Sequence, residues 1–157
     1  MAGVALVLLV ISAALLAACQ DERVEVDGFH VTSADRAPCR ELVEALPEKL
    51  ADAPRRKTSG SEYAAAWGDP AIVLRCGVPL PGSYATDPCI TRDGIGWSIP
   101  LQQTEDQDTD IVMTLAHRDL IVQVRVPRHY RPNGAMEVMA DLGGVVEEHT
   151  TARGRCS

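Results

Sequence analysis

The pattern of hydrophobic and polar positions divides the chain into an apolar start and a mixed remainder. Residues 1–18 contain no charged side chain, and the run ends in Leu16-Ala17-Ala18-Cys19. An apolar region followed by small residues is typical of a secretory signal peptide. A Leu, two small residues and a Cys after such a run form the lipobox of bacterial lipoproteins. We therefore expect residues 1–18 to be a lipoprotein signal peptide and Cys19 to be lipidated.

A transmembrane helix is the alternative interpretation of the same run. Such a helix needs about 20 apolar residues, and here no Lys/Arg cluster follows the run to stop its transfer. Met-Ala-Gly also lacks the positive charge of a signal peptide's start, which indicates either an upstream start or a charge from the N-terminal amine alone. Two acyl chains on Cys19 would anchor the protein stably. The expected location is the extracytoplasmic face of the cell membrane.

The polar residues that follow are interpreted as a short tether. Residues 19–33 hold the lipidated Cys and this tether, with a short strand expected at Phe29–Thr32. Residues 34–157 contain no repeat and no low-complexity tract, and we expect them to form a single extracytoplasmic domain. Their number suits one ordinary domain with its own hydrophobic core.

Helical periodicity occurs near both ends of this domain. Apolar residues at helical spacing predict a helix over residues 35–50, which Pro47 breaks or kinks. A second helix is predicted from Asn133 to the glycine pair Gly143-Gly144, which should end it. Between them, Tyr63–Trp67 is interpreted as a helical turn.

Strand patterns fill the middle of the chain. The apolar run Ala71–Cys76 predicts a buried strand, and Ile90–Ile99 predicts a hairpin that turns at Asp93-Gly94. Ile111–Leu115 and the alternating segment Leu120–Val126 predict a second hairpin. These elements predict an α+β fold in which an antiparallel sheet of four to five strands carries two main helices on one face.

The cysteines fit an oxidising compartment. The chain has five, and assigning Cys19 to lipid leaves an even set: Cys39, Cys76, Cys89 and Cys156. Three pairings are open to four cysteines. We expect Cys76–Cys89, which would close a local loop, with Cys39–Cys156 joining the first helix to the C-terminal end. Because no Cys-x-x-Cys occurs, these bonds are interpreted as structural staples.

The net charge of −7 arises entirely after residue 18. A nucleic-acid-binding domain needs a basic surface, so we expect no nucleic-acid partner, and membrane contact through the acyl chains alone. Two basic clusters, at Pro54–Lys57 and at Arg125–Arg131, are interpreted as solvated loops.

The candidate binding residues are Trp67, Asp69, Arg75 and Trp97. Aromatic rings beside a charged pair suit a sugar or a peptide segment. The alternative is that both Trp side chains fill the core, because only one Phe and three Tyr are available to do so. On that interpretation, which we favour, Asp69 simply caps the turn before Pro70.

No spacing typical of catalysis or of metal binding occurs. Asp106-x-Asp108-x-Asp110 resembles the start of a calcium loop, but Ile111 and His117 stand where that loop needs Gly and Glu. The chain has no Gly-x-Ser-x-Gly, no Ser-x-x-Lys and no Gly-rich phosphate loop. We therefore expect no cofactor, no metal and no enzymatic activity. Zinc-binding spacing is also missing from the histidines, which are His30, His117, His129 and His149.

One segment resembles a known family. Residues Ala66–Val78, AWGDPAIVLRCGV, resemble the signature of a family of actinobacterial lipoproteins called domain of unknown function 3515. Leu46-Pro47, Gly94–Trp97 and the strand at Val122–Pro127 fit the same family, so the resemblance covers Cys39–Tyr130. It implies a secreted, membrane-anchored protein of high-GC Gram-positive bacteria. It implies no activity and transfers no catalytic residue.

The sequence therefore predicts a membrane-anchored cell-envelope lipoprotein that acts as a non-enzymatic interaction or accessory module with an envelope protein partner. The alternative is a module that binds an envelope sugar or peptide through Trp67, Trp97 and Arg75. A hydrolase acting on cell-wall material is a third hypothesis, and it would require catalytic residues that only the fold brings together.

Overall fold

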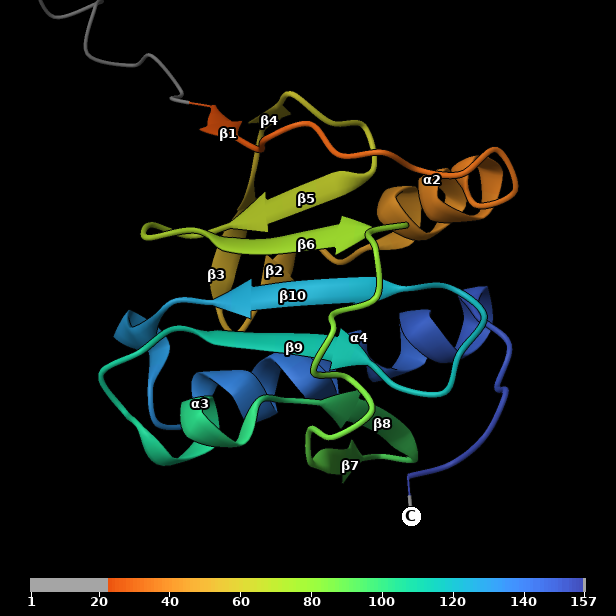
Figure 1. The fold of residues 1–157 in the computed structure, drawn as a ribbon. Coiled ribbons are helices and arrows are strands. Elements are labelled where there is room, and N and C mark those ends of the chain that lie inside the picture. The colour runs from red at the N-terminus through yellow and green to blue at the C-terminus, as the bar shows by residue number, and fades with distance from the viewer. Residues whose placement is uncertain (1–22, 157) are drawn as a thin grey trace, which may run out of the picture.

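The computed structural model describes residues 23–156 (Figure 1). The predicted signal peptide at residues 1–18 and the predicted lipidation site at Cys19 lie outside the described residues. Between residues 23 and 156, no helix is long and apolar enough to cross a membrane.

An antiparallel sheet of eight strands forms the body of the domain, in the order β2-β3-β5-β6-β10-β9-β8-β7. A separate pair, β1 (Val24–Glu25) and β4 (Thr58–Ser59), is parallel and lies beside β5 (Figure 1). The strands of the large sheet are β2 (Lys49–Leu50), β3 (Ala53–Arg56), β5 (Ala64–Trp67), β6 (Ile72–Cys76), β7 (Cys89–Arg92), β8 (Ile95–Ser98), β9 (Ile111–Leu115) and β10 (Val122–Val126).

The predicted sheet of four to five strands is wrong, because three further strands occur before β6. Strand β5 reads Ala-Ala-Ala-Trp, and alanine has the highest intrinsic helix propensity. All four of its residues are buried, and hydrogen bonding to β3 and β6 on either side overrides that propensity. Likewise, the basic segment Pro54–Arg56, expected to be a solvated loop, belongs to β3.

The helices are α2 (Arg36–Ala45), α3 (Leu101–Glu105) and α4 (Gly134–His149), with a short 3₁₀ helix η2 (Arg128–Tyr130). Helix α2 ends two residues before Pro47, earlier than predicted, and the chain turns into β2. Helix α4 continues past Gly143-Gly144 to His149, because its apolar face continues through Leu142 and Val146, both fully buried.

Helices α2 and α4 cover the same face of the sheet (Figure 1). Side chains that alternate along the strands fill the space between, as Leu74 of β6 and Val124 of β10 do, both fully buried. The opposite face carries the intervening residues and is crossed by the loop from Gly77 to Pro88 (Figure 1). Strand β6 and the hairpins β7–β8 and β9–β10 are confirmed at their predicted places.

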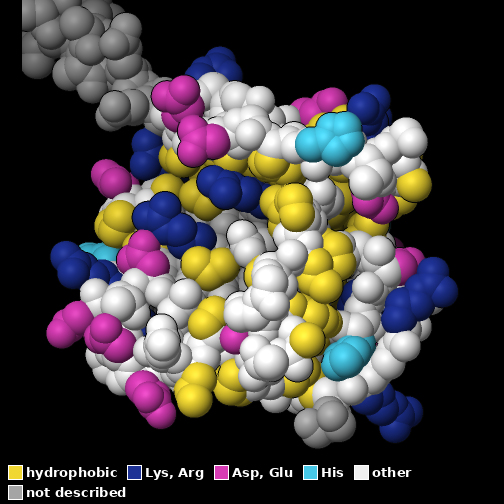
Figure 2. Space-filling view, viewed as in Figure 1, with side chains coloured by type: hydrophobic (Ala, Val, Ile, Leu, Met, Phe, Trp, Pro, Cys, Tyr) yellow, Lys and Arg dark blue, Asp and Glu magenta, His cyan; other side chains and the backbone are white. Residues whose placement is uncertain are grey.

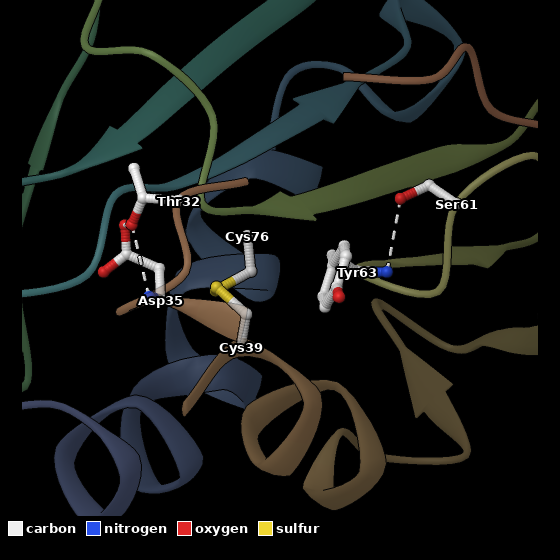
Figure 3. The surroundings of a disulfide bond; sticks show 6 residues. All are labelled: Thr32, Asp35, Cys39, Ser61, Tyr63 and Cys76. Carbon is white, nitrogen blue, oxygen red and sulfur yellow. Dashed lines mark hydrogen bonds between the residues drawn. A yellow bond between two sulfur atoms is a disulfide. The ribbon is translucent and has the colours of Figure 1, made fainter. Parts of the chain in front are cut away.

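The described cysteines form two disulfides, but the expected pairing is wrong. Cys39 of α2 is bonded to Cys76 of β6 (Figure 3), and Cys89 of β7 is bonded to Cys156. Strands β10, β9 and β8 separate β6 from β7, which places those two strands roughly 19 Å apart. A disulfide needs Cα atoms within about 7 Å. Cys76 and Cys89 also lie on opposite faces of the sheet, as the strand registers show.

The chain joins the domain directly after residue 23. Strand β1 pairs with β4, and the side chains of Val26 and Val31 are 1% and 3% exposed. The strand expected at Phe29–Thr32 is instead irregular chain. The segment is therefore packed against the domain from Val24 onward, at the end of the sheet near β5.

Candidate functional site

The two Trp side chains lie in the core, beneath the helices. Both are 0% exposed. The indole N–H of Trp67 donates to the carbonyl of Pro47 at 2.9 Å, and the guanidinium of Arg55 lies 5.8 Å from the ring centroid. An exposed aromatic platform is therefore excluded, and the hypothesis of a sugar- or peptide-binding surface on Trp67 and Trp97 is wrong.

The other two candidate binding residues lie apart from the Trp side chains and from each other. The Asp69 side chain is 90% exposed in the β5–β6 turn, 4.0 Å from the guanidinium of Arg56. Arg75 lies on the face away from the helices, opposite Ala64 of β5 and Gln123 of β10. The fold therefore does not bring the four predicted residues into one site.

The basic cluster after β10 holds the chain together locally. Arg128 donates to the carbonyl of Asp108 at 3.2 Å, and Arg131 donates to the carbonyls of Gln103 and Asp106 at 2.9 and 2.8 Å. Tyr130 donates its hydroxyl to the carbonyl of Pro70 at 3.0 Å. These contacts fasten η2 to the segment around α3 and to the β5–β6 turn, so the cluster is more than a solvated loop.

Two carboxylates of the acidic triplet, those of Asp106 and Asp110, accept hydrogen bonds from other protein groups. Asp106 accepts the backbone N–H of Asp108 at 2.9 Å. Asp110 accepts the backbone N–H of Arg128 at 3.0 Å and the side chain of Arg125 at 2.8 Å. The hydrogen bond from Arg128, aided by Arg125, lowers the pKa of Asp110. This carboxylate therefore connects β9 to the end of β10.

Two cavities meet around the Cys89–Cys156 disulfide. We call the larger one the hairpin cavity; it has a volume of about 430 Å³. The smaller one, the loop cavity, has about 310 Å³. Ala116 lines both. The hairpin cavity is lined by Thr91, Gly94, Gly96, Ala116, Arg118, Ala152, Gly154, Arg155 and Cys156. The loop cavity is lined by Tyr84, Ala85, Asp87, Pro88, Cys89, Ser98, Ala116 and His117.

The C-terminal segment forms one wall of the hairpin cavity because it pairs with the β9–β10 turn. The backbone N–H of Arg153 donates to the carbonyl of His117 at 2.7 Å, and the backbone N–H of Asp119 donates to the carbonyl of Thr151 at 3.1 Å. The Asp119 carboxylate accepts the N–H of Thr151 at 2.8 Å. Partial burial opposes ionisation of Asp119, but the hydrogen bonds from Thr151 and the charge of Arg153 lower its pKa overall.

Two glycines allow the tight packing here. A Cβ at Gly96 would collide with the Sγ atom of Cys156 and lie 3.3 Å from that of Cys89. A Cβ at Gly154 would lie 3.2 Å from the Nδ1 atom of His117. The disulfide therefore rests directly on β8, and the C-terminal segment rests on the β9–β10 turn.

The loop cavity holds hydroxyl, imidazole and carboxylate groups. Ser98 is 4% exposed, and its hydroxyl has no hydrogen-bond partner among residues 23–156. His117 has a left-handed backbone (φ +54°), and its N–H donates to the hydroxyl of Tyr84 at 2.9 Å. This bond holds the Gly77–Pro88 loop against the β9–β10 turn and closes the cavity on one side.

A comparison with family profiles decides the family. The profile described as "Protein of unknown function (DUF3515)" matches residues 1–154. The chain belongs to this family. No curated protein and no solved structure matches the chain. The DUF3515 match therefore spans both the N-terminal apolar run and nearly all of the described domain, and its description assigns no activity.

The hairpin cavity and the loop cavity together form a cleft, which sequence reasoning did not predict for this DUF3515 protein. Its walls come from four separated segments: the Gly77–Pro88 loop, the β7–β8 hairpin, the β9–β10 turn and the C-terminal segment. The Asp93-Gly94 turn and the cysteines were visible signals, but only the correct pairing of Cys89 with Cys156 joins the hairpin to the C-terminal segment.

Proposed function

We propose that the protein is a lipid-anchored, non-enzymatic binding module on the extracytoplasmic face of the cell membrane, and that the cleft around Cys89–Cys156 binds its envelope partner. The observation that carries the proposal is the placement of the two ends of the domain. The chain enters at β1, beside β5, whereas β7 and the C-terminal end lie toward the other edge of the sheet (Figure 1). The residues that line the cleft belong to this second region.

The tether length supports this arrangement. Val24 of β1 follows Cys19 by five residues, which span at most about 18 Å when fully extended. From β5 to β7 the sheet adds five strand spacings, roughly 24 Å. A lipid on Cys19 would thus hold the β1–β4 end beside the membrane, while the cleft would face outward toward a partner.

The two disulfides support an oxidising location. Disulfides persist in secreted and surface proteins and are rare where thiols are kept reduced. Cys39–Cys76 and Cys89–Cys156 account for every cysteine after Cys19. Cys19 is thereby left as the cysteine available for lipid, in agreement with the Leu-Ala-Ala-Cys motif.

The geometry of the loop cavity supports binding over hydrolysis. A serine nucleophile needs a base within about 3.2 Å of its hydroxyl. Ser98 and His117 line the same cavity, but no hydrogen bond joins them, and the Ser98 hydroxyl is buried. The backbone N–H of His117 donates to the hydroxyl of Tyr84, which fixes the turn.

A pair of measurements in whole cells tests the proposal. Replacing Cys19→Ser should move the protein from the membrane fraction into the medium or the soluble fraction and abolish its labelling by palmitate. A photo-crosslinking amino acid at Thr91, in the cleft, should capture a discrete partner. The same amino acid at Glu25, an exposed position on β1, is the matched control and should not capture that partner. Membrane retention of the Cys19→Ser protein, or equal capture from both positions, would contradict the proposal.

A further inference from the structure

We propose that the hairpin cavity is an oxyanion site, in which Arg118 and Arg155 bind a carboxylate or phosphate group of the ligand. This inference deepens the proposed function by naming the ligand's chemistry, and it rests on that function for the cleft's role. The first observation is the composition of the walls. Both arginines line the cavity, and no Asp or Glu does.

The charge around the cavity is opposite to that of the whole protein. The chain carries a net charge of −7. Four arginines nevertheless lie on the segments that build the cavity, against the two carboxylates of Asp93 and Asp119. Figure 2 shows Arg and His side chains at the lower right, near the C-terminal end, whereas acidic side chains gather at the lower left, toward α3. The four are Arg92, Arg118, Arg153 and Arg155.

Arg118 is held in position with part of its guanidinium unused. One terminal nitrogen, Nη1, donates to the carbonyl of Thr150 at 3.0 Å and lies 3.3 Å from its hydroxyl oxygen. The Nε and Nη2 groups have no hydrogen-bond partner in the described part of the chain. Carboxylates and phosphates accept two parallel N–H bonds from such a fork. Because the side chain is already fixed, less conformational entropy is lost on binding.

Arg155 supplies a second charge. Its side chain is on the exposed C-terminal segment and makes no ion pair or hydrogen bond within residues 23–156. Two guanidinium groups on one cavity repel each other, and an anion between them replaces that repulsion with attraction. The exposed Thr91 on the opposite wall offers a hydroxyl donor.

The space is suitable for a small anionic group on a larger ligand. A volume of about 430 Å³ falls within the usual range for ligand pockets. Five of the lining residues are glycine or alanine, which keeps the cavity open between the arginines: Gly94, Gly96, Ala116, Ala152 and Gly154. The Cys89–Cys156 disulfide holds the two walls at a fixed separation.

The test uses the full-length protein in detergent micelles and the backbone amide NMR signals of Gly94, Gly96 and Gly154. Inorganic phosphate and N-acetylglycine are the two anionic probes, and N-acetylglycinamide is the uncharged control. We expect saturable shifts at these three signals with an anionic probe and none with the amide. Whichever anion binds more tightly identifies the ligand group as phosphate or carboxylate.

Arg155→Gln is the decisive variant, because Arg155 makes no hydrogen bond or ion pair within residues 23–156 and its replacement should leave the fold intact. We expect affinity for the anion to fall about tenfold, as for the loss of a charge-assisted hydrogen bond. Arg118→Lys should weaken binding as well, because lysine keeps the charge but lacks the fork. Arg92→Gln is the matched control: Arg92 pairs with Asp93 at 3.1 Å and does not line the cavity, so affinity for the anion should fall much less than in Arg155→Gln.

Absence of saturable shifts with both anions, equal shifts with the amide, or an unchanged affinity in Arg155→Gln would overturn the oxyanion site. These outcomes are independent of the cell experiments. Loss of membrane anchoring with intact anion binding would overturn the proposed function alone, whereas correct anchoring and partner capture without anion binding would overturn this inference alone.

Discussion

At Gly96, strand β8 passes directly beneath the Cys89–Cys156 disulfide, and a side chain of any size would collide with the Sγ atom of Cys156. That sulfur is covalently fixed and cannot move aside as the end of a flexible side chain can. We expect Gly96→Ala to lower the free energy of unfolding by about 1–3 kcal/mol, as overpacking does elsewhere, or to leave the disulfide unformed. Urea unfolding and counting of free thiols measure both effects.

Gly144→Ala is the control for that experiment. Gly144 is exposed in α4, and a Cβ there would meet nothing within 4 Å. Alanine is favoured over glycine within a helix by roughly 0.5–1 kcal/mol. The variant should therefore be slightly more stable than the parent, and destabilisation of both variants alike would show that the contact at Gly96 is not the cause.

Asp110 should make stability depend on pH in acid. Its pKa is lowered in the folded protein, chiefly by the backbone N–H of Arg128 and also by Arg125. The ionised group therefore stabilises the fold above its ordinary pKa of 3.8, and this contribution is lost as the pH falls through the lower folded pKa. Asp110→Asn should be less stable than the parent near neutral pH, and the difference should shrink in acid.

Thermal unfolding across that pH range measures the effect of Asp110. Asp27→Asn, which removes one negative charge at an exposed position after β1, is the matched control. If both variants show the same pH dependence, net charge rather than the contacts of Asp110 determines the stability in acid.

Among the elements, the end of α2 depends on one arginine from β3. Arg55 donates to the carbonyls of Leu46 and Val43 at 2.7 and 2.8 Å and lies against the ring of Trp67. Lysine keeps the charge but cannot make both bonds in this geometry. We expect Arg55→Lys to cost about 1–3 kcal/mol of unfolding free energy, measured by urea denaturation. Arg92→Lys, with a side chain that is 45% exposed, should cost close to nothing.

The contacts of Arg55 illustrate why some elements could be predicted from the sequence and others could not. Strand β10 and the β7–β8 hairpin follow local alternation and turn chemistry, so the sequence alone predicts them. Strands β3 and β5 carry Arg55 and three alanines, and neither pattern indicates a strand. Their conformation depends on tertiary contacts, the hydrogen bonds of Arg55 to the end of α2 and the pairing of β5 with β6, which the residue pattern of each strand alone does not reveal. The cleft eluded prediction for the same reason, since four separated segments build it.

On the scale of the whole molecule, the two disulfides differ in access to solvent. Cys39 and Cys76 are both 0% exposed, whereas Cys89 and Cys156 are partly exposed. Exposed disulfides are the more readily reduced. Increasing concentrations of a dithiol should therefore open Cys89–Cys156 first, releasing the C-terminal segment while the sheet persists. Alkylation followed by mass spectrometry identifies the free thiols, and far-ultraviolet circular dichroism reports the sheet. Simultaneous opening of both bonds would contradict the expectation.

The strand order divides the sheet into two consecutive halves, β2-β3-β5-β6 and β10-β9-β8-β7, joined where β6 pairs with β10. Among the four cysteines after Cys19, each disulfide joins two that are consecutive in the sequence, Cys39 with Cys76 and Cys89 with Cys156. For a chain that emerges N-terminus first into an oxidising compartment, pairing of the cysteines after Cys19 in order of arrival gives these two bonds. We therefore expect such a protein to form its native bonds without a disulfide isomerase to correct mistakes.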